Sequence, residues 1–183
     1  MTDASPIPNV LTIAGSDPSG GAGIQADLKT FSAQGSYGSS VITALTAQNT
    51  RGVSGVHPVP AEFITAQLET LLDDVRIDAV KIGMVASLDV AEVIRAALSR
   101  RRPRWVVLDP VMVAKSGDIL VDDAGIHAVR EVLVPLADLI TPTSPRPRCC
   151  WACRPPRRGT KCWPWPRRCA GWAPAPPCSR AAT

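Results

Sequence analysis

Short apolar runs alternate with longer amphipathic segments along most of the chain. The runs are rich in β-branched residues and bounded by Gly, Pro or Asp, which is typical of buried strands. The longer segments repeat apolar residues every three or four positions, which predicts helices with one buried face. The expected strands are 9–14, 41–46, 79–84, 105–108 and 138–141, with a short extended piece at 53–59. The expected helices are 22–34, 60–72, 88–99 and 122–133.

This alternation of strands and helices predicts the class and the site. Strands separated by helices of 10 to 15 residues favour a parallel sheet covered by helices on both faces. Ligands of such sheets bind beyond the carboxyl ends of the strands. We therefore expect four segments to line one crevice: 15–23, 47–51, 83–84 and 109–117.

Composition divides the chain near residue 143. The 183 residues are 45% hydrophobic and 20% charged, which suits one globular domain with a sizeable core. Residues 1–143 hold 11 basic and all 16 acidic residues, a net charge of −5, whereas residues 144–183 hold 9 basic residues and no acidic one. The overall charge of +4 therefore belongs to the second segment, and the folded domain gives no sign of a nucleic-acid partner.

The N-terminal part of the chain predicts a cytoplasmic protein. It has no apolar run of about 18 residues for a membrane span, and its first residues lack the basic start and apolar stretch of a signal peptide. Residues 1–143 contain no cysteine, so this domain uses no disulfide. We expect neither a membrane nor a nucleic acid as a partner.

A glycine-rich segment follows the first strand. Residues 21–26 fit the pattern G-x-G-x-x-A of dinucleotide sites, but no acidic residue stands about 20 positions on, and no Gly-Lys-Ser/Thr marks a P-loop. The alternative is that these glycines only permit a tight turn and close helix packing. In either case the N-terminus of the next helix would suit an anion or a polar ligand.

Polar side chains follow two further strands. Gln48 and Asn49 offer a donor and an acceptor to an amino-substituted heterocycle, or they form an ordinary turn. Asp109 ends an apolar run before proline, which suits a metal-linked or phosphate-linked acid or a turn cap. The segment 115–117 is Lys-Ser-Gly and could bind phosphate or be a solvated loop. Two isolated histidines are given no catalytic role: His57 and His127.

Three long segments together resemble one family. The segments are LTIAGSDPSGGAGIQADLKTFSAQGSYGSSVITALTAQNTRGV at Leu11–Val53, VRIDAVKIGM at Val75–Met84 and VVLDPVMVAKSGD at Val106–Asp118. In this order they resemble the hydroxymethylpyrimidine/phosphomethylpyrimidine kinases of thiamine biosynthesis, in the ribokinase-like superfamily. The closely similar pyridoxal-type kinases remain an alternative. The resemblance covers residues 9–142.

The resemblance implies a fold, a reaction and a set of site residues. The fold would be an α/β three-layer ribokinase-like sandwich with a mostly parallel central sheet, incomplete on its C-terminal side. The reaction would move the γ-phosphoryl group of ATP to 4-amino-5-hydroxymethyl-2-methylpyrimidine and then to its monophosphate. Asp109 would lie toward the phosphates and Mg²⁺. Carried over position by position, the substrate-binding residues are Gly15, Asp27, Gln48, Met84 and Val111.

The same resemblance places the catalytic machinery beyond residue 143. ATP and Mg²⁺ would be the cofactors and a small pyrimidine the partner, with a homo-oligomer left open. The family's Asn-x-x-Glu and Lys-Gly-Gly-His motifs are absent from residues 144–183, and so is its Gly-Thr-Gly-Cys loop, which carries the base and the anion hole. We therefore assign no catalytic residue and no metal ligand, and we expect this chain to transfer no phosphate. A non-catalytic pyrimidine-binding remnant is the alternative function.

A shifted reading frame accounts for residues 144–183. This segment holds all 6 Cys, 4 of the 5 Trp and 9 of the 18 Pro, but no Leu, Ile, Val, Met or Phe. Every Cys or Trp codon begins TG, and in the shifted frame each becomes Leu, Val or Met. Suitable codons for residues 143–154 then encode Leu-Pro-Glu, which with one restored base completes the family motif. We expect domain 1–143 to be kinase-like and 144–183 to be frame-shifted and disordered.

Two other interpretations of this segment are weaker. Cys150 and Cys153 form a single C-x-x-C pair, and no second pair or histidine completes a zinc or redox site at usual spacing. A basic arm with Trp rings has the ingredients of nucleic-acid binding. The many prolines and the lack of aliphatic residues argue against an ordered module of either kind.

Overall fold

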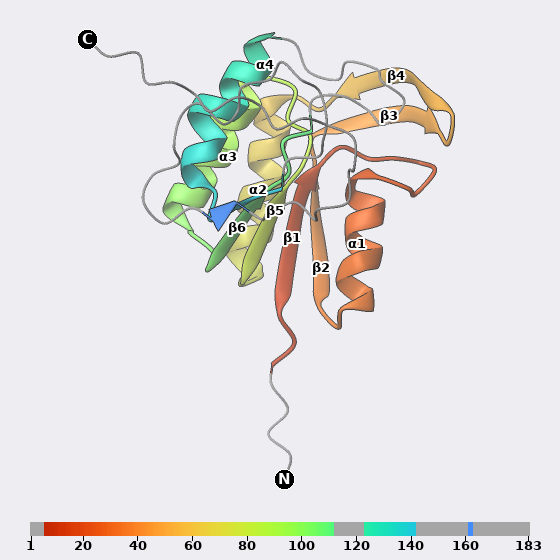
Figure 1. Cartoon of the computed structure of the whole chain (residues 1–183). Helices are drawn as coiled ribbons and strands as arrows, with labels where there is room; N and C mark the ends of the chain where they lie inside the picture. The colour runs from red at the N-terminus through yellow and green to blue at the C-terminus, as the bar shows by residue number, and fades with distance from the viewer. Residues whose placement is uncertain (1–5, 112–122, 142–160, 163–183) are drawn as a thin grey trace, which may run out of the picture.

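The computed structural model describes residues 6–111, 123–141 and 161–162 (Figure 1). Within this part of the chain the main sheet has six strands, all parallel, in the order β2-β1-β5-β6-β7-β8. The strands are β1 (Asn9–Ala14), β2 (Tyr37–Ile42), β5 (Ala79–Ile82), β6 (Trp105–Leu108), β7 (Leu139–Ile140) and β8 (Lys161–Cys162). The predicted parallel sheet is therefore present.

Strand β1 pairs on both of its edges. Val10 lies opposite Gly38 of β2 on one side and Ala79 of β5 on the other. Leu11 and Ile13 are fully buried in the hydrophobic core. Because successive side chains of a strand point to opposite faces, Thr12 points to the other side of the sheet.

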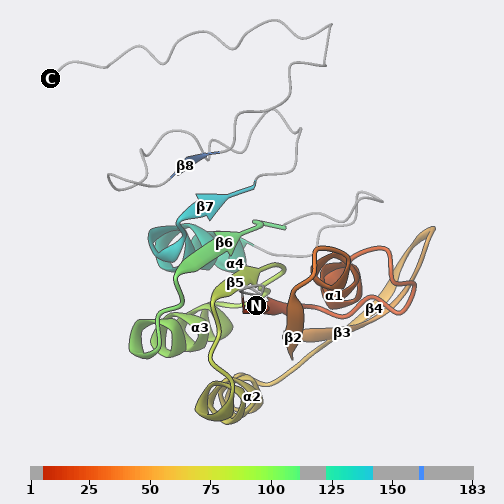
Figure 2. The ribbon, with the colours of Figure 1, turned by 90° about the horizontal axis from the view of Figure 1, so that it is seen from below.

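Helices cover both faces of the sheet, as Figure 2 shows. Helices α2, α3 and α4 lie along one face, and helix α1 lies on the other, against β1 and β2. The face under α2 and α3 holds the main core, which includes Ile64, Leu68, Ile94 and Leu98. The helices are α1 (Gly23–Ala33), α2 (Ala61–Asp74), α3 (Leu88–Arg100) and α4 (Asp123–Ala128), the last continued by a π-helical segment (Val129–Leu133) and a 3₁₀ turn (Val134–Leu136).

The prediction of one strand at 41–46 is wrong, because this segment is divided between the main sheet and a separate antiparallel hairpin. The chain leaves the main sheet after Ile42 and forms β3 (Ala44–Asn49) and β4 (Gly52–Pro58). Thr43 marks the break: its amide donates to the carbonyl of Ala14, and its hydroxyl donates to the carbonyl of Met84 at 2.9 Å. An apolar run does not reveal this change of sheet, because both parts consist of β-prone residues.

Aspartates fix the amino ends of two strands. Asp78, just before β5, accepts from the amide of Asn9 at 2.9 Å and from the guanidinium of Arg76. Asp138, just before β7, accepts from the amide of Val106 at 2.8 Å and from the guanidinium of Arg102. Each carboxylate thereby aligns its own strand with the start of the neighbouring strand.

Some sequence predictions lie outside the described residues. One is the prediction that residues 112–117 line the crevice. The other is the prediction that residues 144–183 are frame-shifted and disordered, of which the structure describes only strand β8. The described helices include none that is long and apolar enough to cross a membrane.

The turn into α1 requires glycine at position 23. Gly23 has φ +57°, and a Cβ there would lie 2.4 Å from the carbonyl oxygen of Gly15. That carbonyl accepts from the amide of Ile24, so it is not free to move aside. Gly35, after α1, has φ +71°, but a Cβ on this residue would meet no described atom within 4 Å.

These two glycines form a matched pair for a stability test. Both Gly23→Ala and Gly35→Ala place a side chain in the left-handed region, which costs about 1–2 kcal/mol. Gly23→Ala also meets the Gly15 carbonyl, so we expect it to lower the free energy of unfolding by at least about 2 kcal/mol more than Gly35→Ala. Urea denaturation measures both. Equal losses would show that the Gly15 carbonyl moves freely.

Candidate functional site

A small apolar cluster lies beyond the carboxyl ends of β1, β5 and β6. Ala44 and Met84 are buried together, and Val111 packs against them. A Cβ on Gly15 would lie 2.8 Å from Met84 Cε, so the bare backbone at Gly15 lies directly against the thioether. The structure thus brings together three of the five predicted substrate-binding residues, namely Gly15, Met84 and Val111.

Gln48 is connected to the loop of Gly15 through the hydroxyl group of Thr46. Thr46 Oγ1 donates to the carbonyl of Ser16 at 2.8 Å and lies 3.3 Å from Gln48 Oε1. Ser16 directly follows Gly15, and its amide donates to the carbonyl of Ala44 at 2.9 Å. The half-buried carboxamide of Gln48 is therefore tied to the same loop that carries Gly15.

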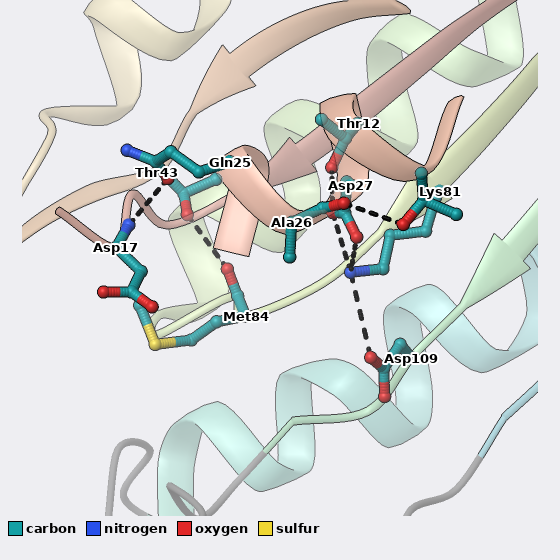
Figure 3. A network of polar contacts seen from close by, with 10 residues as sticks. Thr12, Asp17, Gln25, Ala26, Asp27, Thr43, Lys81, Met84 and Asp109 are labelled. Atoms are coloured by element: carbon teal, nitrogen blue, oxygen red, sulfur yellow. Dashed lines mark hydrogen bonds and ion pairs between the residues drawn. The ribbon is translucent and has the colours of Figure 1, made fainter. Parts of the chain in front are cut away.

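Asp27 lies in a second, ionic group (Figure 3). Thr12 Oγ1 donates to Asp27 Oδ2 at 2.6 Å, and Lys81 Nζ donates to both carboxylate oxygens of Asp27, at 3.1 and 2.9 Å. Lys81 Nζ also lies 3.8 Å from Asp109 Oδ2. Both oxygens of Asp27 are thus engaged within the protein, and its predicted contact with a substrate stays a prediction.

The ammonium of Lys81 fits beside a glycine. A Cβ on Gly83 would lie 3.1 Å from Lys81 Nζ and 2.8 Å from the Cβ of Ala14. The missing side chain therefore leaves room for the lysine head on the α1 side of the sheet. The Lys81 side chain is 21% exposed and that of Asp27 18%, so water screens this ion pair less than an exposed one.

Asp109 is the least satisfied member of the ionic group. Its Oδ1 is buried and has no hydrogen-bond partner in the part of the chain that the structure describes. Burial raises the pKa of Asp109, and the charge of Asp27 raises it further, whereas the ammonium of Lys81 opposes the rise. An acid with a buried free oxygen at the end of a strand is suited to meet a proton donor or a cation.

The glycine-rich loop before α1 is closed by a residue of its own. The carboxylate of Asp17 accepts from the amides of Ser19, Gly21 and Ala22, at 2.8, 3.1 and 2.8 Å. These amides belong to the segment for which the sequence leaves a dinucleotide turn or an anion site open. In the structure an internal carboxylate occupies them, which favours the interpretation of these glycines as a tight turn.

Sequence reasoning missed several polar residues of this region. Lys81 stands in a strand that is otherwise apolar, and that contrast was the available signal. Asp17 and Thr46 carried no distinguishing pattern, because short polar residues are common in loops and strands. The described residues contain no group of three or more His, Cys, Asp or Glu side chains that could hold a metal ion.

Comparison with known proteins shows which family this chain resembles. A family model described as Phosphomethylpyrimidine kinase matches residues 17–148. The hydroxymethylpyrimidine/phosphomethylpyrimidine kinase of Escherichia coli (strain K12) is 57% identical over 137 residues, which are 75% of this chain and 52% of that protein. The enzyme of the same name from Salmonella typhimurium is 58% identical over the same length and the same shares. The chain spans about half the length of these curated relatives.

Solved structures agree with the family model. Phosphomethylpyrimidine kinase from Clostridium difficile 630 has a TM-score of 0.70 at 51% identity, over 74% of this chain and 58% of that chain. Pyridoxal kinase from Staphylococcus aureus, in complex with AMP-PCP and pyridoxal, has a TM-score of 0.65 at 35% identity, over 75% of this chain and 48% of that chain. These similarities confirm the predicted ribokinase-like α/β sandwich.

Asp109 and Asp78, whose pKa values are shifted in opposite directions, provide a test of stability against pH. The raised pKa of Asp109 means that its ionisation costs folding free energy, beginning near the ordinary value of 3.8 and complete above the raised pKa. Asp109→Asn should therefore stabilise the domain at pH 7, with no gain at pH values below 3.8. Thermal unfolding across this range measures the difference.

Asp78→Asn serves as the opposite control. The hydrogen bond from the Asn9 amide and the contact with Arg76 lower the pKa of Asp78, so its ionised form stabilises the fold above pH 3.8. This variant should be less stable than the original chain at pH 7. If both variants shift the unfolding midpoint in the same direction, the assigned environments are wrong.

Proposed function

The chain belongs to the phosphomethylpyrimidine kinase family, and we propose that its described domain is the pyrimidine-binding part of an ATP-dependent kinase. The proposed reaction phosphorylates 4-amino-5-hydroxymethyl-2-methylpyrimidine and then its monophosphate. The observation that carries the proposal is the contact of Gly15 with the Met84 cluster, with Gln48 tied to the same loop.

Each of these residues suits a flat amino-substituted ring. The carboxamide of Gln48 can donate to a ring nitrogen and accept from an exocyclic amino group. The thioether of Met84 is polarisable and packs well against an aromatic ring. Gly15 has no side chain, so a ring can approach the backbone closely there.

The ionic group suits the phosphate side of the reaction. In the proposed step the hydroxymethyl oxygen forms a bond to the γ-phosphorus of ATP, the bond to the β–γ bridging oxygen breaks, and ADP leaves. The hydroxyl proton passes to a base that the resemblance places beyond residue 143. Lys81 supplies positive charge beside Asp109, and transfer of this kind depends mainly on positioning and charge neutralisation.

ATP with Mg²⁺ is part of the proposal. The chemistry of Asp109 fits a hard cation, because carboxylate oxygens are preferred ligands of Mg²⁺ and one oxygen of Asp109 has no partner among the described residues. Bound Mg²⁺ would neutralise charge on the phosphates. Lys81 would keep the carboxylates of Asp27 and Asp109 from repelling one another.

A pyridoxal-type kinase is the second candidate. It is favoured by the similarity to the Staphylococcus aureus pyridoxal kinase. Parallel calorimetric titrations with the hydroxymethylpyrimidine and with pyridoxal separate the two. Tighter binding of pyridoxal would overturn the proposed substrate. Binding of the pyrimidine without turnover, even after the downstream reading frame is restored, would favour a binding remnant.

The side chain of Gln48 provides the test of the pocket. Gln48→Ala should weaken binding of the unphosphorylated pyrimidine by about 1–3 kcal/mol, because polar atoms of the ligand lose their partner. Gln34→Ala makes the same truncation at an exposed position after α1 and should leave the affinity unchanged. Equal losses in calorimetry would remove Gln48 from the site.

Turnover provides the test of the reaction. We propose that residues 144–183 are translated in a shifted frame, so the 183-residue chain should transfer no phosphate from ATP. A second chain is translated from a gene in which one nucleotide is restored at the Thr143 codon and the downstream frame is completed. This chain should be active, because it regains the base and the anion hole. A phosphorylation assay compares the two with a no-enzyme blank.

Either of two results would contradict this proposal. Turnover by the 183-residue chain above the blank would overturn the frame-shift argument. Inactivity of both chains on both heterocycles would overturn the proposed activity.

A further inference from the structure

The most heavily hydrogen-bonded carboxylate of the site region has no role in the proposed chemistry. Asp17 is only 2% exposed. Its Oδ1 accepts from the amide and hydroxyl of Ser19, at 2.8 and 2.7 Å. Its Oδ2 accepts from the amides of Gly21 and Ala22, and the Ser19 hydroxyl lies 2.9 Å from it. All of these donors belong to the loop that carries Asp17 itself.

The contacts require a negative charge. Burial raises the pKa of Asp17, but the hydrogen bonds from the Ser19 side chain and from the amides of Ser19, Ala22 and Gly21 outweigh it, so the pKa lies below 3.8. An ionised carboxylate has only acceptors, which match the converging N–H and O–H donors. An amide in its place would direct N–H donors at N–H donors.

The same loop contributes Gly15 and Ser16 to the proposed pocket. The backbone of Asp17 is held from the other side, because its amide donates to Gln25 Oε1 at 2.8 Å. The neighbouring Ser16 bonds to Ala44 through its amide and to Thr46 through its carbonyl. Thr46 in turn lies against Gln48. Figure 3 shows Asp17 and Met84 gathered on one side of the view, apart from the ionic group.

We propose that Asp17 is a positioning residue of the pyrimidine pocket, whose carboxylate acts as an internal anion that holds the Gly15–Ser16 backbone against Met84 and Thr46. This rests on the proposed function. Without the anion the amides of the loop lose their shared acceptor, and the loop opens. Gly15 and Gln48 then lose the fixed spacing that a flat ring requires.

The experiment compares two variants with a matched control. Asp17→Asn keeps the shape and removes the charge, whereas Asp17→Ala leaves a space that a small carboxylate can enter. Asp74→Asn removes the same charge at an exposed position at the end of α2. Calorimetry measures the affinity for the hydroxymethylpyrimidine in chloride and in formate at equal ionic strength. Amide hydrogen exchange reports on Ser19, Gly21 and Ala22.

We expect about a tenfold or larger loss of affinity in both Asp17 variants and none in Asp74→Asn. Formate should restore affinity and loop protection to Asp17→Ala but not to Asp17→Asn, whose side chain fills the space. A loss that arises from general destabilisation, and not from the missing anion, would not respond to formate. If Asp17→Ala does not fold in chloride, folding in formate supports the proposal, and failure in both salts overturns it.

Two further outcomes also overturn the proposal. They are original affinity in Asp17→Asn, and a loss in Asp17→Ala that formate leaves unchanged. Failure of the proposed function is distinguishable, because the original chain would then bind neither heterocycle. In that case the exchange of the loop amides still decides whether Asp17 acts as their anion.

Discussion

Strand β1 is the element on which the site depends, because both of its edges are paired and both of its faces are covered. Its alternating residues point in turn to the main core and to the α1 side, and this alternation places Thr12 against Asp27. Its end leads directly into Gly15 and the loop of Asp17. Any displacement of β1 would therefore move the apolar cluster, the ionic group and the loop together.

The carboxylates of this domain show how surroundings assign roles to one residue type. Asp17 has many donors and a lowered pKa, which suits a permanent structural anion. Asp109 is desolvated, its pKa is raised, and its Oδ1 has no hydrogen-bond partner among the described residues. These properties suit a group that binds a ligand. Asp78 and Asp138 stand at the amino ends of strands, where each satisfies backbone and arginine donors. The strand-aligning carboxylates and Asp109 thus lie at opposite ends of the same sheet.

The charged residues of the site lower the stability of the fold. Lys81 interrupts a buried strand with an ammonium group, and Gly83 gives up a side chain to make room for it. An apolar residue in place of Lys81 would avoid burying an ammonium group, and a neutral residue in place of Asp109 would remove a desolvated charge. The proposed function nevertheless requires charge at this edge of the sheet, because phosphoryl transfer depends on neutralising the transferred group.

The sequence by itself determined the alternation of strands and helices, the parallel sheet and the family, because apolar periodicity and long motifs are local properties. It also indicated Gly15, Met84 and Val111, which the structure brings into one cluster. Only the tertiary structure separated β3 from the main sheet, engaged Asp27 with Lys81, and closed the glycine-rich loop on Asp17. Those contacts join residues up to 54 positions apart, or depend on where a loop carboxylate points. Neither distance in the sequence nor residue type reveals such contacts, since packing of the whole sheet decides which groups meet.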